Sequence, residues 1–325
     1  MATLKDVARE AGLSVGTVSR VLNNRGYISD ETRESVNSAM TKLNYQPNEM
    51  ARSLSKQKNN TIGVIVPSID HPYFAKLISC LEQAASRAQY KILLFCSRGK
   101  VKREEEYVRA CRSNRVAGLI LCTGNIETAK LKNLGFPVVT YERLLNCGDA
   151  GVECDNVEGG RLAAEELTGS GCRHPVIIRG TSDVSMPADT RKDGFMEGCR
   201  NAGVEGRDYS IRPERLDDLD YYQDIRNLLD ENPDTDGIFA GSDIIAAQAI
   251  RVCHERGIRV PEDIKIVGYD DVPVASLTVP SITTVHQPVS EMADACIRII
   301  LNAAEGRKPP ARTTFHVSLV KRETT

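Results

Sequence analysis

Hydrophobic and polar positions follow two different periods along this chain. Between residues 3 and 45, apolar residues recur every three to four positions, which predicts three short amphipathic helices. Thr3 and Asp6 have the spacing of a capping box, and Gly12 is placed to end the first helix. Ser14 and Ser29 are placed to cap the second and third helices. The residues expected to form this small core are Val7, Ala11, Val18, Val21, Leu22, Val36, Met40 and Leu43.

From Thr61 onward, short runs rich in β-branched residues alternate with amphipathic helical segments. This alternation is typical of βαβ units and predicts parallel sheets. About 260 residues of it exceed what one sheet usually needs, so we expect two lobes. The predicted strands are Ile62–Val66, Ile92–Phe95, Gly118–Leu121, Val138–Tyr141, Val176–Ile178, Gly237–Ala240 and Ile264–Gly268. The predicted helices between them include Tyr73–Ala88, Gly159–Leu167, Asp243–Arg256 and Val289–Ala304.

Composition narrows the class of protein. The 325 residues are enough for two or three domains, and 41% hydrophobic and 26% charged residues are ordinary for a globular protein. We find no apolar run long enough to cross a membrane and no apolar segment near the N-terminus, so secretion is not expected. Ten cysteines without a CxxC pair favour reduced thiols, and we therefore expect a cytoplasmic protein without a metal or cofactor.

Charge is distributed unevenly along the chain. Residues 1–58 carry nine Lys and Arg against six Asp and Glu, whereas the remainder carries 33 against 38. A basic N-terminal segment attached to an acidic body is what a phosphate-binding module on another domain would show. A solvated surface would also explain so small an excess of positive charge. Sequence motifs are therefore needed to decide whether this segment binds nucleic acid.

Two motifs at the N-terminus resemble the lactose-repressor/galactose-repressor family of bacterial transcription factors. They are Gly12-Leu13-Ser14-Val15-Gly16-Thr17-Val18-Ser19-Arg20-Val21-Leu22-Asn23 and Pro47-Asn48-Glu49-Met50-Ala51-Arg52-Ser53-Leu54. The resemblance implies a small all-α helix-turn-helix headpiece and an α/β two-lobed periplasmic-binding-protein-like body with parallel sheets. The implied limits are 1–46 for the headpiece, 47–60 for a hinge helix and linker, and 61–325 for the body. Within the body, the N-lobe would span about 61–157 and 288–318, and the C-lobe about 158–287 and 319–325.

The second helix of the headpiece would read the DNA major groove. By resemblance, base edges are contacted by Val15, Gly16 and Arg20; arginine suits bidentate contact with guanine, whereas glycine has no side chain to read with. The residues placed to bond phosphates, which position the protein without specifying sequence, are Thr3, Ser14, Thr17, Ser19 and Asn23. For Thr17 and Ser19, capping or solvating a surface helix is the alternative.

The hinge motif implies a second DNA contact. In the family, a short helix here orders when two subunits meet over the operator, and a leucine wedges into the minor groove. The matching residue is Leu54, and the motif also places Asn48, Ala51 and Arg52 at the DNA. The alternative is that Leu54 packs against its own headpiece.

Polar and aromatic residues follow several predicted strands, and ligands of open α/β sheets bind at the carboxyl ends of strands. An arginine and an acid can bracket vicinal hydroxyls while an aromatic ring stacks on a sugar face, which favours a sugar or polyol effector. By resemblance, the effector contacts are Tyr73, Phe74, Glu142, Arg191, Ser242, Asp270 and Gln287. Asp189, two residues before the arginine of the R-x-x-G-F motif Arg191–Phe195, departs from the family and adds a carboxylate. Phe74 as a core residue and Gln287 as a partner of the backbone remain alternatives.

The segment Asp155–Ala163, together with Gly171-Cys172, looks like the sucrose- and ribose-repressor branch. We therefore expect a repressor of a carbohydrate-utilisation operon that binds double-stranded operator DNA as a homodimer, formed through apolar helix faces such as Phe74–Leu81. A regulator controlled by a protein co-effector is the first alternative, and a solute-binding protein is the second. We find no P-loop, G-x-S-x-G, HExxH or G-x-G-x-x-G motif, so an enzyme is not expected.

Overall fold

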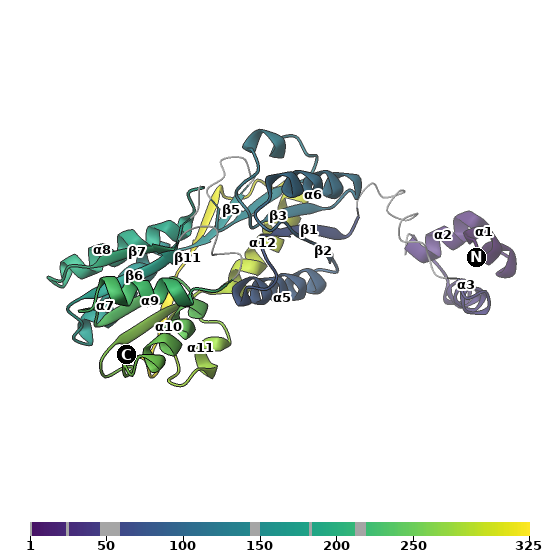
Figure 1. Ribbon diagram of the computed structural model, residues 1–325. Coiled ribbons are helices and arrows are strands. Elements are labelled where there is room, and N and C mark those ends of the chain that lie inside the picture. Colours follow the sequence, from purple (N-terminus) through teal and green to yellow (C-terminus); the bar gives the residue numbers. More distant parts are fainter. Residues whose placement is uncertain (1, 24–25, 46–58, 144–149, 182–183, 212–218) are drawn as a thin grey trace. The chain divides into compact units, whose positions relative to one another are not determined.

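The chain forms two compact units, Met1–Asn59 and Asn60–Thr325. The computed structural model describes residues 2–23, 26–45, 59–143, 150–181, 184–211 and 219–325 (Figure 1). No helix in these ranges is both long and apolar enough to cross a membrane. The two units are described one at a time below.

Within its described residues, the first unit contains three helices, which form the headpiece. They are α1 (Leu4–Glu10), α2 (Val15–Asn23) and α3 (Asp30–Lys42). Asp6 donates its backbone N–H to the Thr3 hydroxyl, and the Asp6 carboxylate accepts the Thr3 N–H at 2.9 Å, which completes the predicted capping box. Gly12 adopts a φ of +65°, a left-handed conformation that a residue with a Cβ rarely takes, and it lets the chain turn into α2.

The headpiece core is small. Its fully buried side chains are Val7, Ala8, Val18, Val21, Val36 and Ala39, and the partly buried ones around them include Ala11, Leu22, Met40 and Leu43. All eight predicted core positions lie in or against this core, and it also contains Ala8 and Ala39, which were not predicted. Because three short helices bury little apolar surface, each core side chain carries a large share of this unit's stability.

The described residues of the second unit, the body, form two six-stranded sheets. The first sheet has the order β11-β5-β4-β3-β1-β2, and every pairing within it is parallel. Its strands are β1 (Thr61–Val66), β2 (Lys91–Cys96), β3 (Gly118–Leu121), β4 (Val138–Tyr141), β5 (Ala150–Cys154) and β11 (Arg312–Phe315). Helices α5 (Pro72–Arg87), α6 (Val101–Ser113) and α12 (Val289–Ala304) cover this sheet, and we call the whole the N-lobe (Figure 1).

The second sheet has the order β12-β10-β9-β8-β6-β7, and only the β10–β12 pair is antiparallel. Its strands are β6 (Pro175–Gly180), β7 (Arg207–Ile211), β8 (Gly237–Ala240), β9 (Lys265–Asp270), β10 (Thr283–His286) and β12 (Ser318–Val320). Its helices are α7 (Asn156–Gly169), α8 (Arg191–Asn201), α9 (Tyr222–Glu231), α10 (Asp243–Glu255) and α11 (Val274–Leu277), and together they form the C-lobe. The predicted fold class, a helical headpiece with a two-lobed parallel α/β body, is confirmed.

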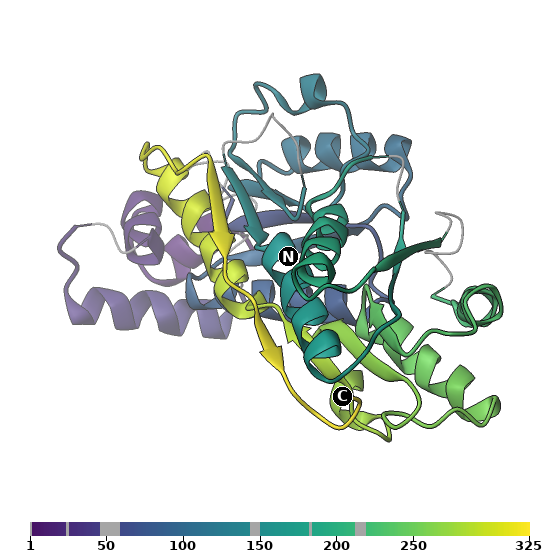
Figure 2. The same ribbon diagram turned by 90° about the vertical axis from the view of Figure 1, so that its left-hand side faces the viewer.

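The chain crosses between the lobes three times. The first crossover joins β5 to α7, the second joins β10 to α12, and the third joins β11 to β12. Figure 2 shows the third as a continuous yellow segment that adds one strand to each sheet. The side chains nearest the crossovers therefore belong to the part of the molecule about which the lobes can move.

Helices α7 and α8 pack through their backbones. A Cβ added to Gly160 would lie 1.9 Å from the carbonyl oxygen of Arg191, and a Cβ on Gly194 would lie 1.8 Å from that of Val157. Only glycine permits so close an approach at these two positions. The contact fixes the start of α8, and with it Arg191, against α7.

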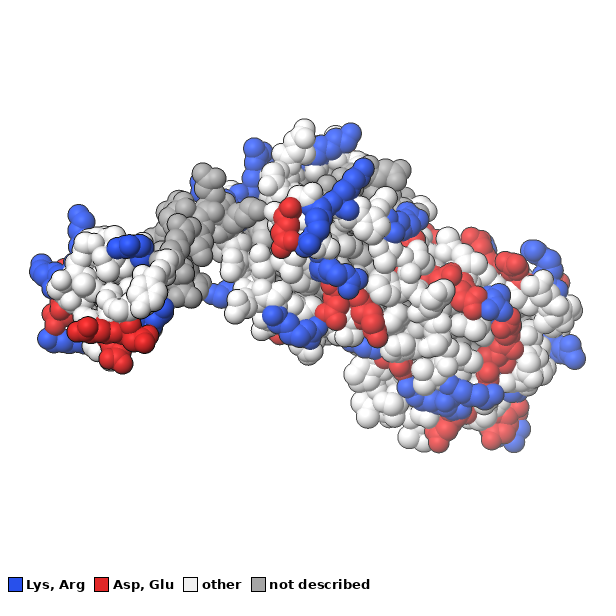
Figure 3. Space-filling model, turned by 180° about the vertical axis from the view of Figure 1, so that it is seen from behind, with Lys and Arg blue, Asp and Glu red and all other residues white. Residues whose placement is uncertain are grey.

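Charged side chains of both signs are interspersed over the face of the body drawn in Figure 3. Elsewhere among the described residues, charged side chains form ion pairs, such as Arg256 with Asp230 at 2.8 Å and Arg259 with Asp263 at 2.5 Å. Exposed pairs of this kind contribute roughly 0 to 1 kcal/mol each. Among the described residues in this view, neither sign gathers into one extended patch.

Candidate functional site

The first turn of α2 faces solvent. Val15 is 40% exposed, and Gly16 and Arg20 are also exposed, whereas Val18 and Val21 point into the headpiece core. The helix thus buries one face and presents the opposite one. The three residues that the sequence assigned to base contacts lie on this outer face.

Two of the predicted phosphate-binding hydroxyls cap helices. Ser14 accepts the backbone N–H of Thr17 at 3.0 Å, and the two hydroxyls lie 2.9 Å apart. Ser14 therefore caps α2, as predicted, and Thr3 caps α1. A hydroxyl has one donor, and the Thr3 hydroxyl already donates to the Asp6 carboxylate at 2.7 Å, so in this arrangement it has no hydrogen to give a phosphate. The Ser14 and Thr17 hydroxyls share one hydrogen bond, so one of the two keeps a hydrogen for a phosphate oxygen. Ser19 is half-buried. The side chain of Asn23 lies outside the described part of the chain. So do the predicted hinge contacts, Asn48, Ala51, Arg52 and Leu54.

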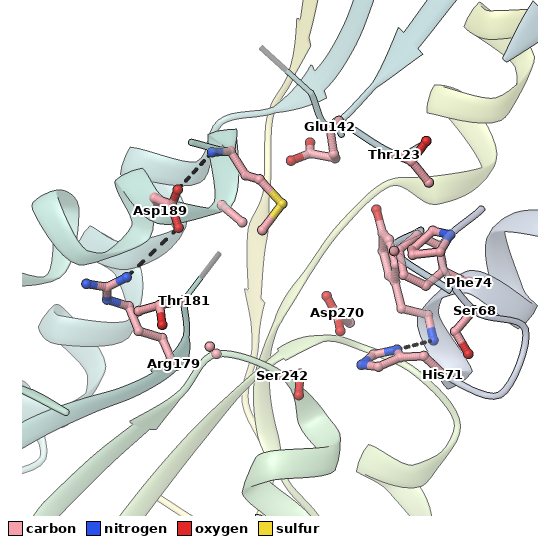
Figure 4. A pocket seen from close by; sticks show the side chains of 18 of the residues that line it. Ser68, His71, Phe74, Thr123, Glu142, Arg179, Thr181, Asp189, Ser242 and Asp270 are labelled. Carbon is pink, nitrogen blue, oxygen red and sulfur yellow. Dashed lines mark hydrogen bonds and ion pairs between the residues drawn. The ribbon is translucent and has the colours of Figure 1, made fainter. Parts of the chain in front are cut away.

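A cleft of about 500 Å³ lies between the lobes of the body. In Figure 4, Asp189 and Arg179 line one side, His71 and Phe74 line the other, and Asp270 lies between them. The structure brings all eight predicted effector-binding residues to this cleft: Tyr73, Phe74, Glu142, Asp189, Arg191, Ser242, Asp270 and Gln287.

Arg191 is held rigidly on the C-lobe side. Its guanidinium carbon lies 3.5 Å from the ring centroid of Tyr269, which is a close cation–π contact. Its Nε donates to Asn156 Oδ1 at 2.8 Å, and its Nη1 donates to the carbonyl of Gly241 at 3.0 Å. Five N–H donors are available on a guanidinium, so Arg191 keeps donors for a ligand in a fixed direction.

Gln287 connects the lobes at the second crossover. Its Nε2 donates to Asp270 Oδ1 at 2.7 Å, and its Oε1 accepts the Tyr73 hydroxyl at 3.1 Å. The Tyr73 and Tyr141 hydroxyls lie 3.0 Å apart. The side chain of Gln287 therefore bonds other side chains, not the backbone. Burial raises the pKa of the Asp270 carboxyl, although the nearby guanidinium of Arg191 acts in the opposite direction.

Glu142 closes the N-lobe side of the cleft. It is buried, follows β4 directly and has a φ of +51°. Its carboxylate accepts the backbone N–H of Cys154 and the Asn156 amide, the latter at 3.0 Å. The protein therefore already bonds both oxygens of this carboxylate.

Asp189 is also engaged by the protein. It accepts the backbone N–H of Met186 at 2.8 Å, which caps the short 3₁₀ helix η2 (Pro187–Thr190), and it lies 3.9 Å from an Arg179 nitrogen. Arg179 in turn makes two hydrogen bonds with Asp208, at 2.9 and 3.0 Å. Although Asp189 lines the cleft, its carboxylate helps to build the wall, and it is less available to a ligand than the sequence suggested.

The remaining wall is aromatic and polar. Phe74 is partly buried, with its ring edge-on to Tyr73 at 5.5 Å, so it belongs both to the core and to the cleft. Ser242 caps α10 by accepting the N–H of Ile245 at 3.4 Å. His71 caps α5 through Nδ1, and burial, aided by Arg191, lowers its pKa to about 4. His71 is therefore a neutral acceptor at physiological pH.

Sequence reasoning did not select several residues of the cleft. Among them are His71, Tyr141 and Arg179. Tyr141 ends a predicted strand and Arg179 directly follows one, so the rule that ligands gather at the carboxyl ends of strands could have found both. Within the described ranges, no group of three His, Cys, Asp or Glu side chains is arranged to hold a metal ion.

Comparisons with known proteins agree with this geometry. Residues 3–48 match the family described as bacterial regulatory proteins, lacI family, and residues 164–325 match the periplasmic binding protein-like domain. The ribose operon repressor of Halalkalibacterium halodurans is 37% identical over 100% of this chain and 97% of its own. The sucrose operon repressor of Streptococcus mutans is 32% identical over 99% of both chains. The crystal structure of the lac repressor dimer bound to operator and the anti-inducer ONPF superimposes with a TM-score of 0.87 at 25% identity, covering 99% of this chain and 98% of that one.

A helix-turn-helix headpiece followed by a two-lobed body with a ligand cleft defines a DNA-binding regulator of the repressor type. The chain belongs to the LacI family of bacterial regulatory proteins.

Proposed function

We propose that this protein represses a carbohydrate-utilisation operon in the cytoplasm, binds a palindromic operator as a homodimer and responds to a sugar in the interlobe cleft. One observation carries the proposal: polar groups from both lobes converge on one cleft in a chain that also has an exposed reading helix. The relatives named ribose and sucrose operon repressors support the choice of a sugar. The lac repressor dimer bound to operator supports the assembly on DNA.

The chemistry of the cleft suits a neutral, hydroxyl-rich ligand. Arg191 offers N–H donors in a fixed direction, Asp270 offers a carboxyl group, and Phe74 offers an apolar ring face. Vicinal hydroxyls bond an arginine and an acid in pairs, while the apolar face of a sugar ring packs on an aromatic side chain. Arginines and acids both line the cleft, so a ligand with several hydroxyl groups would find donors and acceptors there.

A sugar that touches both lobes would regulate DNA binding by selecting one lobe arrangement. Coupling requires only that the sugar bind one arrangement more tightly than the other. Typical couplings between two sites change affinity about 5-fold to 150-fold. The sign of the response, induction or co-repression, depends on which arrangement suits the operator.

A thermal-shift panel on the purified full chain tests the proposal. The panel contains D-ribose, sucrose, cellobiose, sugar phosphates and purines, and the matched variant is Arg191→Lys, which keeps the charge but loses the planar stack. A ligand at a hundred times its Kd adds about 2.7 kcal/mol of stability, so the wild-type melting temperature should rise with one neutral sugar and not rise in the variant. Equal shifts in both proteins would refute the cleft assignment, and no shift with any compound would favour a protein co-effector.

A further inference from the structure

The side chain of Asn156 joins the two lobes behind the cleft. Asn156 is the first residue of α7, where the chain enters the C-lobe, and it is only 3% exposed. It is absent from the described residues that line the cleft. Asn156 therefore has no direct route to a ligand, yet it contacts two side chains that do line the cleft, Glu142 and Arg191.

All the hydrogen-bonding sites of the Asn156 amide have partners: its donors bond the N-lobe and its acceptor oxygen bonds the C-lobe. Its Nδ2 donates to Glu142 Oε2 at 3.0 Å and to the carbonyl of Cys154 at 3.2 Å, both in the N-lobe. Its Oδ1 accepts Arg191 Nε at 2.8 Å and the Tyr269 hydroxyl at 3.5 Å, both in the C-lobe. An amide has two donors and two acceptor sites, so no capacity is left over. Arginine can only donate, which fixes the orientation of the amide.

The C-lobe half of this connection is rigid. Gly160 and Gly194 hold α7 against the start of α8, so Asn156 and Arg191 belong to one backbone-packed block. A Cβ on Gly159 would lie 2.6 Å from the Tyr269 hydroxyl, so Tyr269 is packed against the same block. Movement between the lobes would therefore change the contact between Asn156 and Glu142, as it would the Gln287 contacts at the second crossover.

We infer that Asn156 is a positioning residue that ties the N-lobe acid Glu142 to the C-lobe arginine Arg191 and so sets the interlobe geometry that a ligand meets. The inference rests on the proposed function for its regulatory meaning, because the ligand site is the cleft proposed above. An aspartate at this position would keep the acceptor for Arg191 but would lose both donors and face the Glu142 carboxylate. Asn156→Asp therefore breaks the N-lobe half of the connection alone.

A thermodynamic cycle tests the connection without any ligand. Thermal unfolding of the full chain is measured for Glu142→Ala, Arg191→Ala and the double variant, first with Asn156 and then with Asn156→Ala. With Asn156 present, the loss in Tm of the double variant should be smaller than the sum of the single losses by about 2 °C. With alanine at 156, this difference should shrink to the small direct attraction between the two charges. An unchanged non-additivity in the Asn156→Ala background would mean that the two charges interact directly, and it would overturn the inference.

A binding measurement tests the consequence for the cleft, with D-ribose as the probe and isothermal titration as the readout. Asn156→Asp should weaken D-ribose binding about tenfold, because Glu142 would no longer be held to the block that carries Arg191 and a ligand would meet a less ordered cleft. Val157→Ala is the matched control, since Val157 is the next residue on α7, is 41% exposed and should leave affinity unchanged. Wild-type affinity in Asn156→Asp would overturn the positioning role. If wild-type protein does not bind D-ribose, the ribose form of the proposed function fails, and the unfolding cycle alone decides the inference.

Discussion

The guanidinium of Arg191 is fixed by contacts of three kinds. It stacks on Tyr269, donates to the side chain of Asn156 and donates to the carbonyl of Gly241. A lysine could supply the charge but neither the planar stack nor the paired donors. At the scale of single residues, the cleft is thus a set of side chains whose directions are set before any ligand arrives, which lowers the entropy lost on binding.

Arg20 should specify one base step of the operator. Arg20→Ala should weaken binding to the preferred duplex about tenfold or more, because a bidentate arginine–guanine pair contributes about 1–3 kcal/mol of discrimination. Selection from a random duplex library, followed by sequencing, measures the base preference. Arg9→Ala is the control, since Arg9 is an exposed partner of Asp6 on α1 and should leave the preference intact. An unchanged preference profile in Arg20→Ala would assign base reading to another residue.

Asp270 should give the protein a pH-dependent stability. Burial raises the pKa of Asp270 in the folded state, so the folded protein binds a proton that the unfolded chain has released above its ordinary pKa of about 3.9. The free energy of unfolding should therefore fall as pH rises from about 5 to about 8. Asp270→Asn, which is nearly the same size, should lose less stability over this range in urea titrations. Parallel pH profiles for the two proteins would contradict the assignment.

The identity of the cleft residues was readable from the sequence, but their partners were not. Arg191 could be predicted from its R-x-x-G-F motif and Asp270 from its place after a β-branched run. The stack of Arg191 on Tyr269 and the bridge through Asn156 join residues far apart in the chain. Local sequence patterns carry no information on such contacts. The sequence therefore predicted that Asp189 would face a ligand, but it could not show that the same carboxylate caps η2 and lies beside Arg179.

At the scale of elements, α7 and α8 form one rigid block because their backbones touch. The two glycines at the contact are Gly160 and Gly194. Close backbone packing leaves no side chain that could adjust, so the block is expected to move as a unit when the lobes move. Arg191, at the first position of α8, moves with it.

Gly160→Ala should strongly destabilise the body. The added Cβ would overlap the carbonyl oxygen of Arg191, and overpacking against backbone should cost about 3 kcal/mol or more. Gly169→Ala, in the same helix, is the matched control, because a Cβ there has no neighbouring atom within 4 Å and alanine favours helix. Urea unfolding measures both variants. Similar midpoints for the two would show that α7 and α8 separate easily.

Secondary structure was predictable where a strand is a run of β-branched or apolar residues, and less so at sheet edges. The buried strands β1, β3, β4 and β8 match the predicted ranges. The strands that were not predicted are the edge strands β7, β11 and β12, whose exposed and buried residues alternate or are mostly polar, and the inner strands β5 and β10. The sequences of these strands lack a clear apolar run. They become strands because they pair with a neighbouring strand, and that pairing cannot be seen in the local sequence.

At the scale of the whole molecule, the headpiece should need the hinge motif to bind DNA well. Leu54→Ala should weaken operator binding about tenfold to a hundredfold if Leu54 wedges into the minor groove, since a buried leucine contributes about 1.5–3 kcal/mol. Fluorescence anisotropy with a selected palindromic duplex measures the effect. The variant should bind sugar like the wild type, because the cleft is confined to the body. Equal operator affinity would refute the wedge.

The third crossover also bears on how the body assembles. Strand β5 has its edge neighbour in β11, which the ribosome adds only after strands β6 to β10 of the other sheet. During synthesis, the first lobe therefore keeps an open edge until nearly the whole second lobe exists. Contacts between residues so far apart in sequence form slowly, and a strand edge is prone to aggregation until it is paired. The two lobes therefore depend on each other during folding. A chain that stops before residue 312 would lack β11 in the first sheet and β12 in the second.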